Sequence, residues 1–354
     1  MKALRTGILA LTVLVVASSP ATAGFETEVF GSEDWERAIA ELPVNPDDVV
    51  YPFRVTPEMV EWAQNQLALY STASPDVRLQ GLQKAFFDSG EFEFEYDQAR
   101  TLTAEEAFAA RNGNCMSFTS LFVALSRSVG IPTFLVLVKR QPAVEMDEGL
   151  VVVNRHVVAG YRAPNRMYTY DFYVTSSKQV ATHKVIDDLS ASAIYHTNIG
   201  GLAIRQGDLD EAIHNLEIAT VLAPEWAPGW VNMGVAFMRM GKEEEAFDAL
   251  QKALAVEPGN SSAMINLSRV YRNQGRTEEA NNALRAAAEG PRNPFTLISM
   301  ADLEILRGEY DKARRYLRRA RWWYAKEPYV SDALARLAEV EGVADQVERY
   351  RRKA

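Results

Sequence analysis

Four segments of the sequence repeat one pattern: GDLDEAIHNLEIA at 207–219, GKEEEAFDALQKA at 241–253, GRTEEANNALRAA at 275–287 and GEYDKARRYLRRA at 308–320. Each begins with glycine, and the four glycines are spaced 34, 34 and 33 residues apart. After each glycine, alanine, leucine and a second alanine recur at i, i+4 and i+7 of one another, which places them on one face of a helix. Each unit is therefore predicted to be a helix, a turn at glycine, and a second helix with a narrow apolar face.

Four units in phase over residues 193–327 resemble the tetratricopeptide repeat. Pro224 and Pro258 follow two of the second helices, where a helix must stop, whereas Gly290-Pro291 arrives early in the third unit. The resemblance implies an all-α solenoid whose concave surface binds a protein or peptide. One further amphipathic helix over 330–353, within a capping segment 328–354, is expected to cover the last apolar face.

Two sets of side chains in the repeats have alternative roles. Trp226, Trp230, Phe237 and Tyr271 either line the concave surface or pack between repeats, and helical spacing favours packing. The fourth unit carries a basic run formed by Lys312, Arg314, Arg315, Arg318, Arg319 and Arg321. This Arg314–Arg321 face is either an ordinary solvated surface or a docking patch for an anionic partner.

The composition excludes several classes of protein. The chain has 354 residues, of which 47% are hydrophobic and 24% charged, as in packed globular proteins rather than disordered ones. Its net charge of −9 argues against a general nucleic-acid binder, which needs a basic surface. The one cysteine excludes an internal disulfide and a cysteine-rich metal site.

The first 23 residues have the features of a signal peptide. Lys2 and Arg5 precede the apolar stretch GILALTVLVV at 7–16, and Ala21-Thr22-Ala23 offers a cleavage site. The alternative is an uncleaved anchor, but a membrane span takes roughly 20 apolar residues. Cleavage would leave a mature chain of charge −9 − 2 = −11. We expect an exported protein, periplasmic or secreted.

The segment from residue 24 to 190 lacks the repeat and is predicted to be an α+β domain with a helical N-terminal extension. Thr56-Pro57-Glu58 and Ser74-Pro75-Asp76 predict helices over 57–70 and 75–88. The alternating EFEFEY at 91–96 predicts a strand, and Thr103–Glu106 forms a capping box. An apolar helix over 115–129 and strands near 131–140, 150–161 and 166–174 follow.

Cys115 lies where a helix is predicted to begin. Gly113 permits a tight turn and Asn114 is a good N-cap. In the first turn the helix dipole and the free N–H groups favour negative charge, which suits a nucleophilic thiolate. The alternative is that Cys115 is a small buried apolar residue, as a lone cysteine often is.

His156 and Asp171 can meet across a predicted hairpin. Arg162–Asn165 is turn-forming, and a hairpin centred at 163.5 would place His156 directly opposite Asp171. A carboxylate there would hold one imidazole nitrogen and leave the other to accept the thiol proton. The alternative is an ordinary cross-strand pair on a solvated sheet face.

The stretch GNCMSFTSLFVALSRSVGIPTFLVLV at 113–138, followed by RHVVAGY at 155–161 and YTYDFY at 168–173, resembles the core of the transglutaminase-like superfamily, which is related to papain-type thiol enzymes. The resemblance covers about 75–175. It implies Cys115 as the nucleophile, His156 as general base and then acid, and Asp171 as the orienting residue. Val158 replaces the aromatic residue of many members, so the resemblance indicates a mechanism more than a substrate.

Two functions follow from these features. The first is a cysteine-dependent acyl-enzyme, a hydrolase or transamidase acting on amide bonds of a protein or peptide, with the repeats binding the partner. The second is an inactive adaptor of the same shape. The Cys115 N–H would be one oxyanion donor, and Gln98 is a weak candidate for the other. No cofactor is expected, and no metal, because His183, His196 and His214 have no suitably spaced partners.

Overall fold

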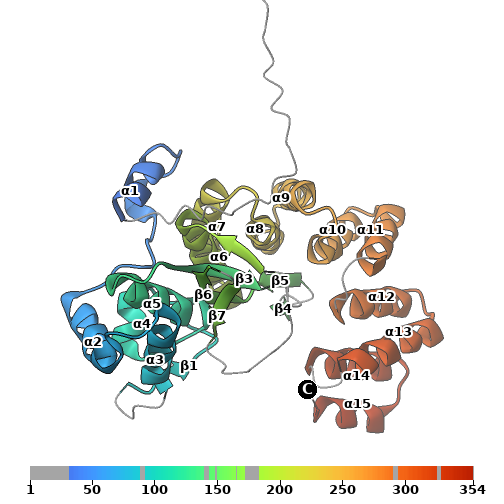
Figure 1. Ribbon diagram of the computed structural model, residues 1–354. Coiled ribbons are helices and arrows are strands. Elements are labelled where there is room, and N and C mark those ends of the chain that lie inside the picture. The colour runs from blue at the N-terminus through green and yellow to red at the C-terminus, as the bar shows by residue number, and fades with distance from the viewer. Residues whose placement is uncertain are drawn as a thin grey trace, which may run out of the picture.

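The chain folds into an α+β part with a small antiparallel sheet, followed by a series of helical pairs (Figure 1). The structure is a computed structural model. It describes residues 32–87, 92–138, 143–147, 150–164, 166–171, 183–289, 294–324 and 328–353. The candidate signal peptide at 1–23 and the early Gly290-Pro291 turn lie outside these residues. The α+β class and the helical repeats predicted from the sequence are confirmed.

Within the described residues the first part has five α-helices, and all but the first begin where the sequence predicts. They are α1 (Ser32–Ala40), α2 (Pro57–Leu67), α3 (Pro75–Phe87), α4 (Ala104–Ala110) and α5 (Cys115–Ser128), with 3₁₀ turns at Pro46–Asp48 and Ala68–Tyr70. The capping box at Thr103 is present, because its hydroxyl accepts from the Glu106 N–H and the Glu106 carboxylate accepts from the Thr103 N–H. The predicted helices over 57–70 and 75–88 are confirmed, except that residue 88 lies outside the described residues.

The strand predicted at 91–96 is shorter than expected. Phe92 and Phe94 are buried while Glu93 and Glu95 are exposed, so the alternation reports burial correctly. Only β1 (Glu95–Tyr96) pairs, in parallel with β2 (Asn112–Gly113), and residue 91 lies outside the described chain. This pairing holds the residues just before α5 against β1.

A four-stranded antiparallel sheet in the order β7-β6-β3-β8 packs against α5. Its strands are β3 (Thr133–Val138), β6 (Val157–Ala163), β7 (Arg166–Tyr170) and β8 (His183–Ile186). Strand β8 was not predicted. The end of the strand predicted at 166–174 lies beyond the described residues.

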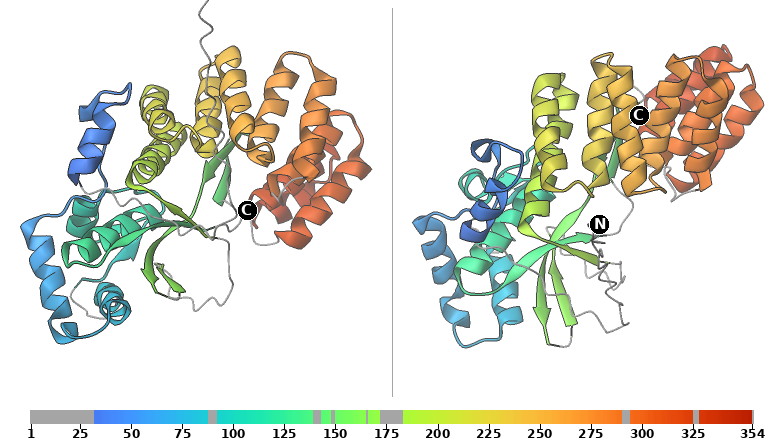
Figure 2. Two further views of the ribbon diagram at one scale, coloured as in Figure 1. Left: turned by 45° about the horizontal axis from the view of Figure 1, so that its top comes forward. Right: turned by 90° about the horizontal axis from the view of Figure 1, so that it is seen from above.

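The single strand predicted at 150–161 is wrong. Leu150–Asn154 forms β5, which pairs with β4 (Ala143–Asp147), and the chain breaks at Arg155 and His156 before β6 joins the other sheet. The physical reason is burial by different partners. Strand β5 packs against the repeat helices α6 (Asp188–Gln206), α8 (Ala227–Arg239) and α10 (Ser261–Asn273), whereas β6 packs against α5 (Figure 2).

Five helical pairs follow in the part of the chain that the structure describes. They are α6 (Asp188–Gln206) with α7 (Leu209–Leu222), α8 (Ala227–Arg239) with α9 (Glu243–Val256), α10 (Ser261–Asn273) with α11 (Thr277–Glu289), α12 (Pro294–Leu306) with α13 (Tyr310–Trp323), and α14 (Pro328–Val340) with α15 (Ala344–Arg351). The glycine at each turn has φ between 72° and 81°, a left-handed conformation that favours glycine. The repeated alanines and leucines are buried between helices, as their spacing predicts.

The single capping helix predicted over 330–353, within 328–354, is wrong. Helix α14 ends at Val340, the chain turns at Gly342 with φ 72°, and α15 runs back along α14. Gly342 follows Gly308 by 34 residues, so the glycine period alone would have predicted a fifth turn. The first alanine and the leucine of the pattern are replaced by Val347 and Arg351 after Gly342, which concealed the fifth turn.

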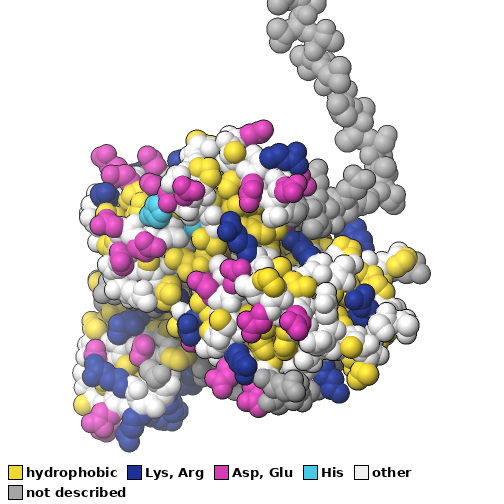
Figure 3. Space-filling view, turned by 90° about the vertical axis from the view of Figure 1, so that its left-hand side faces the viewer, with side chains coloured by type: hydrophobic (Ala, Val, Ile, Leu, Met, Phe, Trp, Pro, Cys, Tyr) yellow, Lys and Arg dark blue, Asp and Glu magenta, His cyan; other side chains and the backbone are white. Residues whose placement is uncertain are grey.

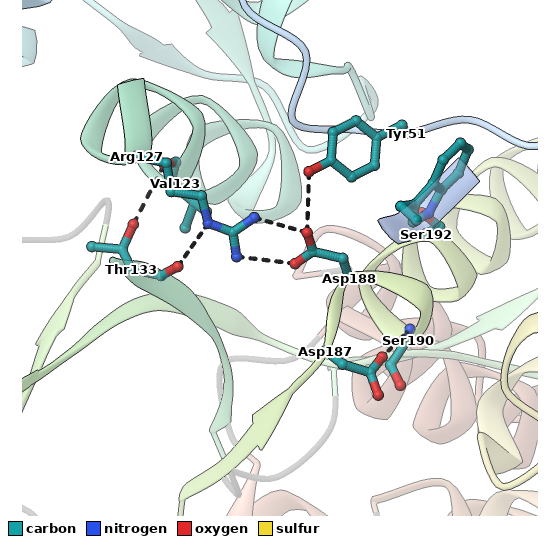
Figure 4. A network of polar contacts seen from close by, with 9 residues as sticks. Tyr51, Val123, Arg127, Thr133, Asp187, Asp188, Ser190 and Ser192 are labelled. Carbon is teal, nitrogen blue, oxygen red and sulfur yellow. Dashed lines mark hydrogen bonds and ion pairs between the residues drawn. The ribbon is translucent and has the colours of Figure 1, made fainter. Parts of the chain in front are cut away.

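A buried polar network joins α5 to the start of the repeats (Figure 4). Arg127 donates to both carboxylate oxygens of Asp188, at 2.8 and 3.0 Å, and to the Thr133 carbonyl. The Tyr51 hydroxyl donates to the same Asp188 carboxylate at 3.1 Å. Because Asp188 begins α6, this network fixes the first repeat helix against the α+β part.

His196 on α6 is a structural residue, as expected. Its Nε2 accepts from the Val50 N–H at 3.1 Å, and its Nδ1 lies 2.8 Å from the Asn215 amide oxygen, to which it donates. Burial lowers the pKa of His196 to about 4, and the Asn215 hydrogen bond opposes this only in part. The ring is therefore neutral at pH 7.

The four aromatic residues of the repeats pack against the hydrophobic cores. Trp226, Trp230, Phe237 and Tyr271 are partly buried against the cores, so the packing role is confirmed.

In the basic run, Arg314 pairs with Asp311 and Glu341, while Arg315, Arg318, Arg319 and Arg321 are exposed. Acidic and basic side chains are interspersed on the face shown in Figure 3. Within the described ranges, every helix is too short or too polar to cross a bilayer.

Candidate functional site

Cys115 is the first residue of α5, held by the cap that the sequence predicted. The Asn114 side-chain oxygen accepts from the N–H groups of Met116 and Ser117, at 3.0 and 3.1 Å, and its amide donates to Thr101. These bonds occupy two N–H groups of the first turn but not that of Cys115. Gly113 has φ 146°, and a Cβ there would lie 2.4 Å from Ser117 Cβ. The turn before Cys115 therefore requires glycine.

His156 and Asp171 meet, with a register different from the predicted one. Strands β6 and β7 pair Ala159 with Tyr170, so the hairpin is centred one residue later than expected and Asp171 is the diagonal neighbour of His156. Diagonal residues two apart project from the same sheet face, and side chains can bridge the distance. His156 Nε2 lies 2.9 Å from Asp171 Oδ2. The directly opposed pairing was wrong, but the contact it was meant to produce is present.

Backbone contacts hold each member of this pair. The Thr119 hydroxyl on α5 donates to the Val157 carbonyl at 3.2 Å, which ties β6 to the Cys115 helix one residue after His156. The Val138 N–H donates to the His156 carbonyl at 3.1 Å. Gln83 on α3 donates its amide to the Asp171 carbonyl at 2.8 Å. Sheet and helices thus position the imidazole from two sides.

The imidazole lies between the carboxylate and the thiol. Burial by itself lowers the pKa of His156, but hydrogen bonds to Asp171 and Cys115 and attraction to their charges outweigh it and raise the pKa to about 10. Since Nε2 faces Asp171, Nδ1 is the nitrogen that can take the Cys115 proton. The Asp171 carboxylate thus favours the charged form of the ring.

These side chains open into a pocket of about 90 Å³ between the α+β part and the first repeat helix. Cys115, His156 and Asn114 line it from the α+β part, and Asn198, Leu202 and Arg205 line it from α6. Gln98, the weak candidate for the second oxyanion donor, also lines it. Sequence reasoning did not predict that the first repeat contributes to this pocket.

Comparisons with known proteins assign both parts of the chain. The transglutaminase-like superfamily profile matches residues 68–169, which contain Cys115 and His156, and the tetratricopeptide repeat profile matches 237–294 and 274–337. The chain carries a transglutaminase-like domain followed by tetratricopeptide repeats. Asp171 lies two residues beyond the first match.

The solved structures that the chain resembles include two tetratricopeptide-repeat proteins and a protein designated pilF. A thermophilic tetratricopeptide-repeat protein of Thermus thermophilus is 19% identical, covers 42% of this chain and 80% of its own, and has a TM-score of 0.39. A tetratricopeptide repeat protein from Parabacteroides merdae is 19% identical over 46% of this chain and 68% of its own, with a TM-score of 0.37. The pilF protein of Pseudomonas aeruginosa is 21% identical over 46% and 78%, with a TM-score of 0.36. No curated protein matched the sequence.

The inner helices of the first three repeats contact a strand of the transglutaminase-like part of the same chain. Asn232 on α8 and Asn266 on α10 each bind one residue of β5 through both amide atoms. The Val153 N–H donates to Asn232 Oδ1 at 2.9 Å and Asn232 Nδ2 donates to the Val153 carbonyl at 3.3 Å. Asn266 makes the same pair with Val151, at 2.8 and 3.0 Å. Helices α8 and α10 therefore bind a strand of the same chain.

A sequence signal for this contact existed but was missed. Asn198, Asn232 and Asn266 each precede a repeat glycine by nine residues, and Ser299 holds that place in the fourth repeat. Buried asparagines at one repeat position indicate a common ligand, since a buried amide needs partners.

Among the described residues no group of three or more histidine, cysteine or carboxylate side chains has metal-binding geometry.

Proposed function

We propose that this protein is an exported, cysteine-dependent acyl-enzyme that acts on amide bonds of a protein or peptide through Cys115, His156 and Asp171. The observation that carries the proposal is the position of His156, whose Nε2 lies 2.9 Å from Asp171 while its ring lines the same pocket as Cys115 at the start of α5. The match to the transglutaminase-like superfamily supports it independently.

The chemistry follows from these three positions. The Cys115 thiolate attacks the amide carbonyl carbon and forms a tetrahedral intermediate, whose oxyanion faces the free N–H of the helix start. His156 then gives its proton to the nitrogen, the C–N bond breaks, and the amine leaves a thioester on Cys115. Asp171 keeps the ring oriented and stabilises its charged form, which the attack requires.

Resolution of the thioester defines two activities. Water, deprotonated by His156, yields a free carboxylic acid, whereas an incoming amine yields a new amide. Gln98 lies at the pocket and is the proposed second oxyanion donor. The products distinguish hydrolysis from transamidation: a new carboxylate indicates the first, and incorporation of an added amine indicates the second.

The cellular setting is also proposed from the sequence. The charged start, short apolar stretch and Ala21-Thr22-Ala23 support export with cleavage after residue 23. The repeats support binding of a partner protein, and the exposed arginines of α13 are the surface offered to an anionic one.

Alkylation of the single cysteine tests the catalytic proposal. A thiol of ordinary pKa near 8.5 is only about 1% thiolate at pH 6.5. With His156 protonated beside it, Cys115 is expected to react with iodoacetamide at pH 6.5 about tenfold faster than in His156→Ala. The exposed His214→Ala is the matched control and should leave the rate unchanged. If the rate follows an ordinary thiol and ignores His156, the protein is an inactive adaptor with the same shape.

A further inference from the structure

The inner helices of the first three repeats present asparagines in one line, and two of the three are occupied. Moving one repeat toward the N-terminus, from Asn266 to Asn232, advances the bound residue by two along β5, from Val151 to Val153. Both bound residues direct their N–H and C=O groups to the same side of the strand, because backbone groups alternate along a strand. The asparagines thus take the place of a neighbouring strand at the edge of β5.

The third asparagine, Asn198, has no such ligand among the described residues of the chain. Continuing the same step would bring it to Arg155, but β5 ends at Asn154 and the chain turns there into β6. The Arg155 side chain pairs with Glu257 at 2.5 Å, and Arg155 lines the same pocket as Asn198. Within the described residues no hydrogen bond is formed by the Asn198 amide, which instead lines the pocket that holds Cys115 and His156.

Building on the function proposed above, we infer that Asn198 binds the main chain of an extended polypeptide substrate beside Cys115. A primary amide both donates and accepts, so it matches the N–H and C=O of one residue in a peptide, as Asn232 and Asn266 do with β5. An ester or a phosphate group has no N–H to donate. The substrate class is therefore a polypeptide strand recognised through its backbone, largely irrespective of its side chains.

The inference also explains why the first repeat is joined rigidly to the catalytic part. Asp188 at the start of α6 is held by Arg127 and Tyr51, and His196 is held by Val50 and Asn215. Both contacts precede Asn198 on the same helix and hold that helix against the part of the chain that carries Cys115. A substrate residue bound by Asn198 is thereby placed next to the thiol, which is what acylation requires.

Thiol-reactive peptides test this inference. The probes are a pool of tetrapeptides ending in a vinyl sulfone, the same pool N-methylated at one backbone position at a time, and methyl vinyl sulfone without a peptide. In each case the Cys115 sulfur adds to the terminal vinyl carbon and a proton is delivered to the adjacent carbon, so no further reactant is needed. Labelling rates are measured by intact mass.

In Asn198→Ala the labelling rate with the peptide pool should fall by roughly tenfold or more, as expected for two lost hydrogen bonds. The rates with methyl vinyl sulfone and iodoacetamide should stay unchanged. N-methylation at one position should slow labelling of the wild type but not of Asn198→Ala. Asn273→Ala, an exposed asparagine outside the pocket, is the matched control and should behave as the wild type.

The inference is overturned if Asn198→Ala reacts with the pool as fast as the wild type, or if the wild type prefers no peptide over methyl vinyl sulfone. It is also overturned if the N-methylation effect survives in Asn198→Ala. The two proposals fail separately. If Cys115 reacts with iodoacetamide as an ordinary thiol, independently of His156, the proposed enzyme activity is wrong. If the same protein still shows a peptide preference that depends on Asn198, the proposed binding site stands.

Discussion

Removing the side-chain amide of Asn232 should destabilise β5, the strand that joins the two parts of the protein. Asn232 and Val153 are both buried, with 0% and 1% of their surface exposed. Asn232→Ala would leave the N–H and C=O of Val153 without partners, and each unsatisfied buried group costs about 1–3 kcal/mol. We therefore expect a loss of about 2–4 kcal/mol in the free energy of unfolding, since part of the cost is relieved by water entering the gap.

Urea unfolding followed by circular dichroism measures the loss, and hydrogen exchange of the Val153 amide locates it. Asn198→Ala is the matched control, because the same repeat position on α6 has no hydrogen-bonding partner among the described residues, and its effect should stay within about 0.5 kcal/mol. The account of β5 as a strand completed by asparagines would be refuted if Asn232→Ala were as stable as the wild type. It would equally be refuted if both substitutions destabilised the protein alike.

Three further predictions concern the buried groups around the site. His196 has a pKa near 4 when folded and about 6.5 when unfolded, so the unfolded chain binds the extra proton and stability falls as the pH drops from 6.5 toward 4. The free energy of unfolding, measured with urea, should therefore fall by roughly 2.5 kcal/mol less between pH 7 and 4.5 in His196→Gln than in the wild type. Equal losses in the two proteins would contradict the prediction. Asp188→Asn should destabilise the protein by about 3–5 kcal/mol because it leaves the Arg127 guanidinium without its charge partner, whereas Asp188→Asn combined with Arg127→Met should recover much of that loss in thermal melts; additive losses would show that the two residues are not coupled. Gly113→Ala, whose added Cβ would lie 2.4 Å from a neighbouring side-chain carbon, should shift the cap and slow iodoacetamide labelling of Cys115 at pH 6.5 by about tenfold, while Gly259→Ala, where a Cβ meets nothing within 4 Å, should not; equal rates in the two variants would show that the cap does not position the thiol.

The position of the nucleophile could be predicted from a few neighbouring residues. Gly113 and Asn114 specify the turn and cap that place Cys115 in the first helical turn, and these interactions span no more than about four residues. The contact between His156 and Asp171 was predicted on a hairpin argument whose centre was one residue too early. The contact survived the error because side chains two residues apart share a sheet face, so a shift of two in the pairing keeps them on the same side.

Contacts between distant segments could not be predicted in this way. Val151 and Asn266 are 115 residues apart; the repeated asparagine position indicates a common ligand, but nothing near Asn266 indicates that this ligand is Val151. The break between β5 and β6 has the same origin, because the apolar residues on either side of Asn154-Arg155-His156 look alike and differ only in which helices cover them. The pocket wall formed by α6 likewise exists only once the first repeat has packed against the transglutaminase-like domain.

The sequence by itself determined the helices, their caps, the turns at repeat glycines and the residue types able to do thiol chemistry, since periodicity and capping act over a few residues. The tertiary structure alone decided the register of the hairpin, the strand held by Asn232 and Asn266, and the placement of Asn198 at the pocket that holds Cys115. The physical reason is that these features depend on which buried surfaces meet. That choice is made by the burial of apolar area and the satisfaction of backbone hydrogen bonds across the whole chain.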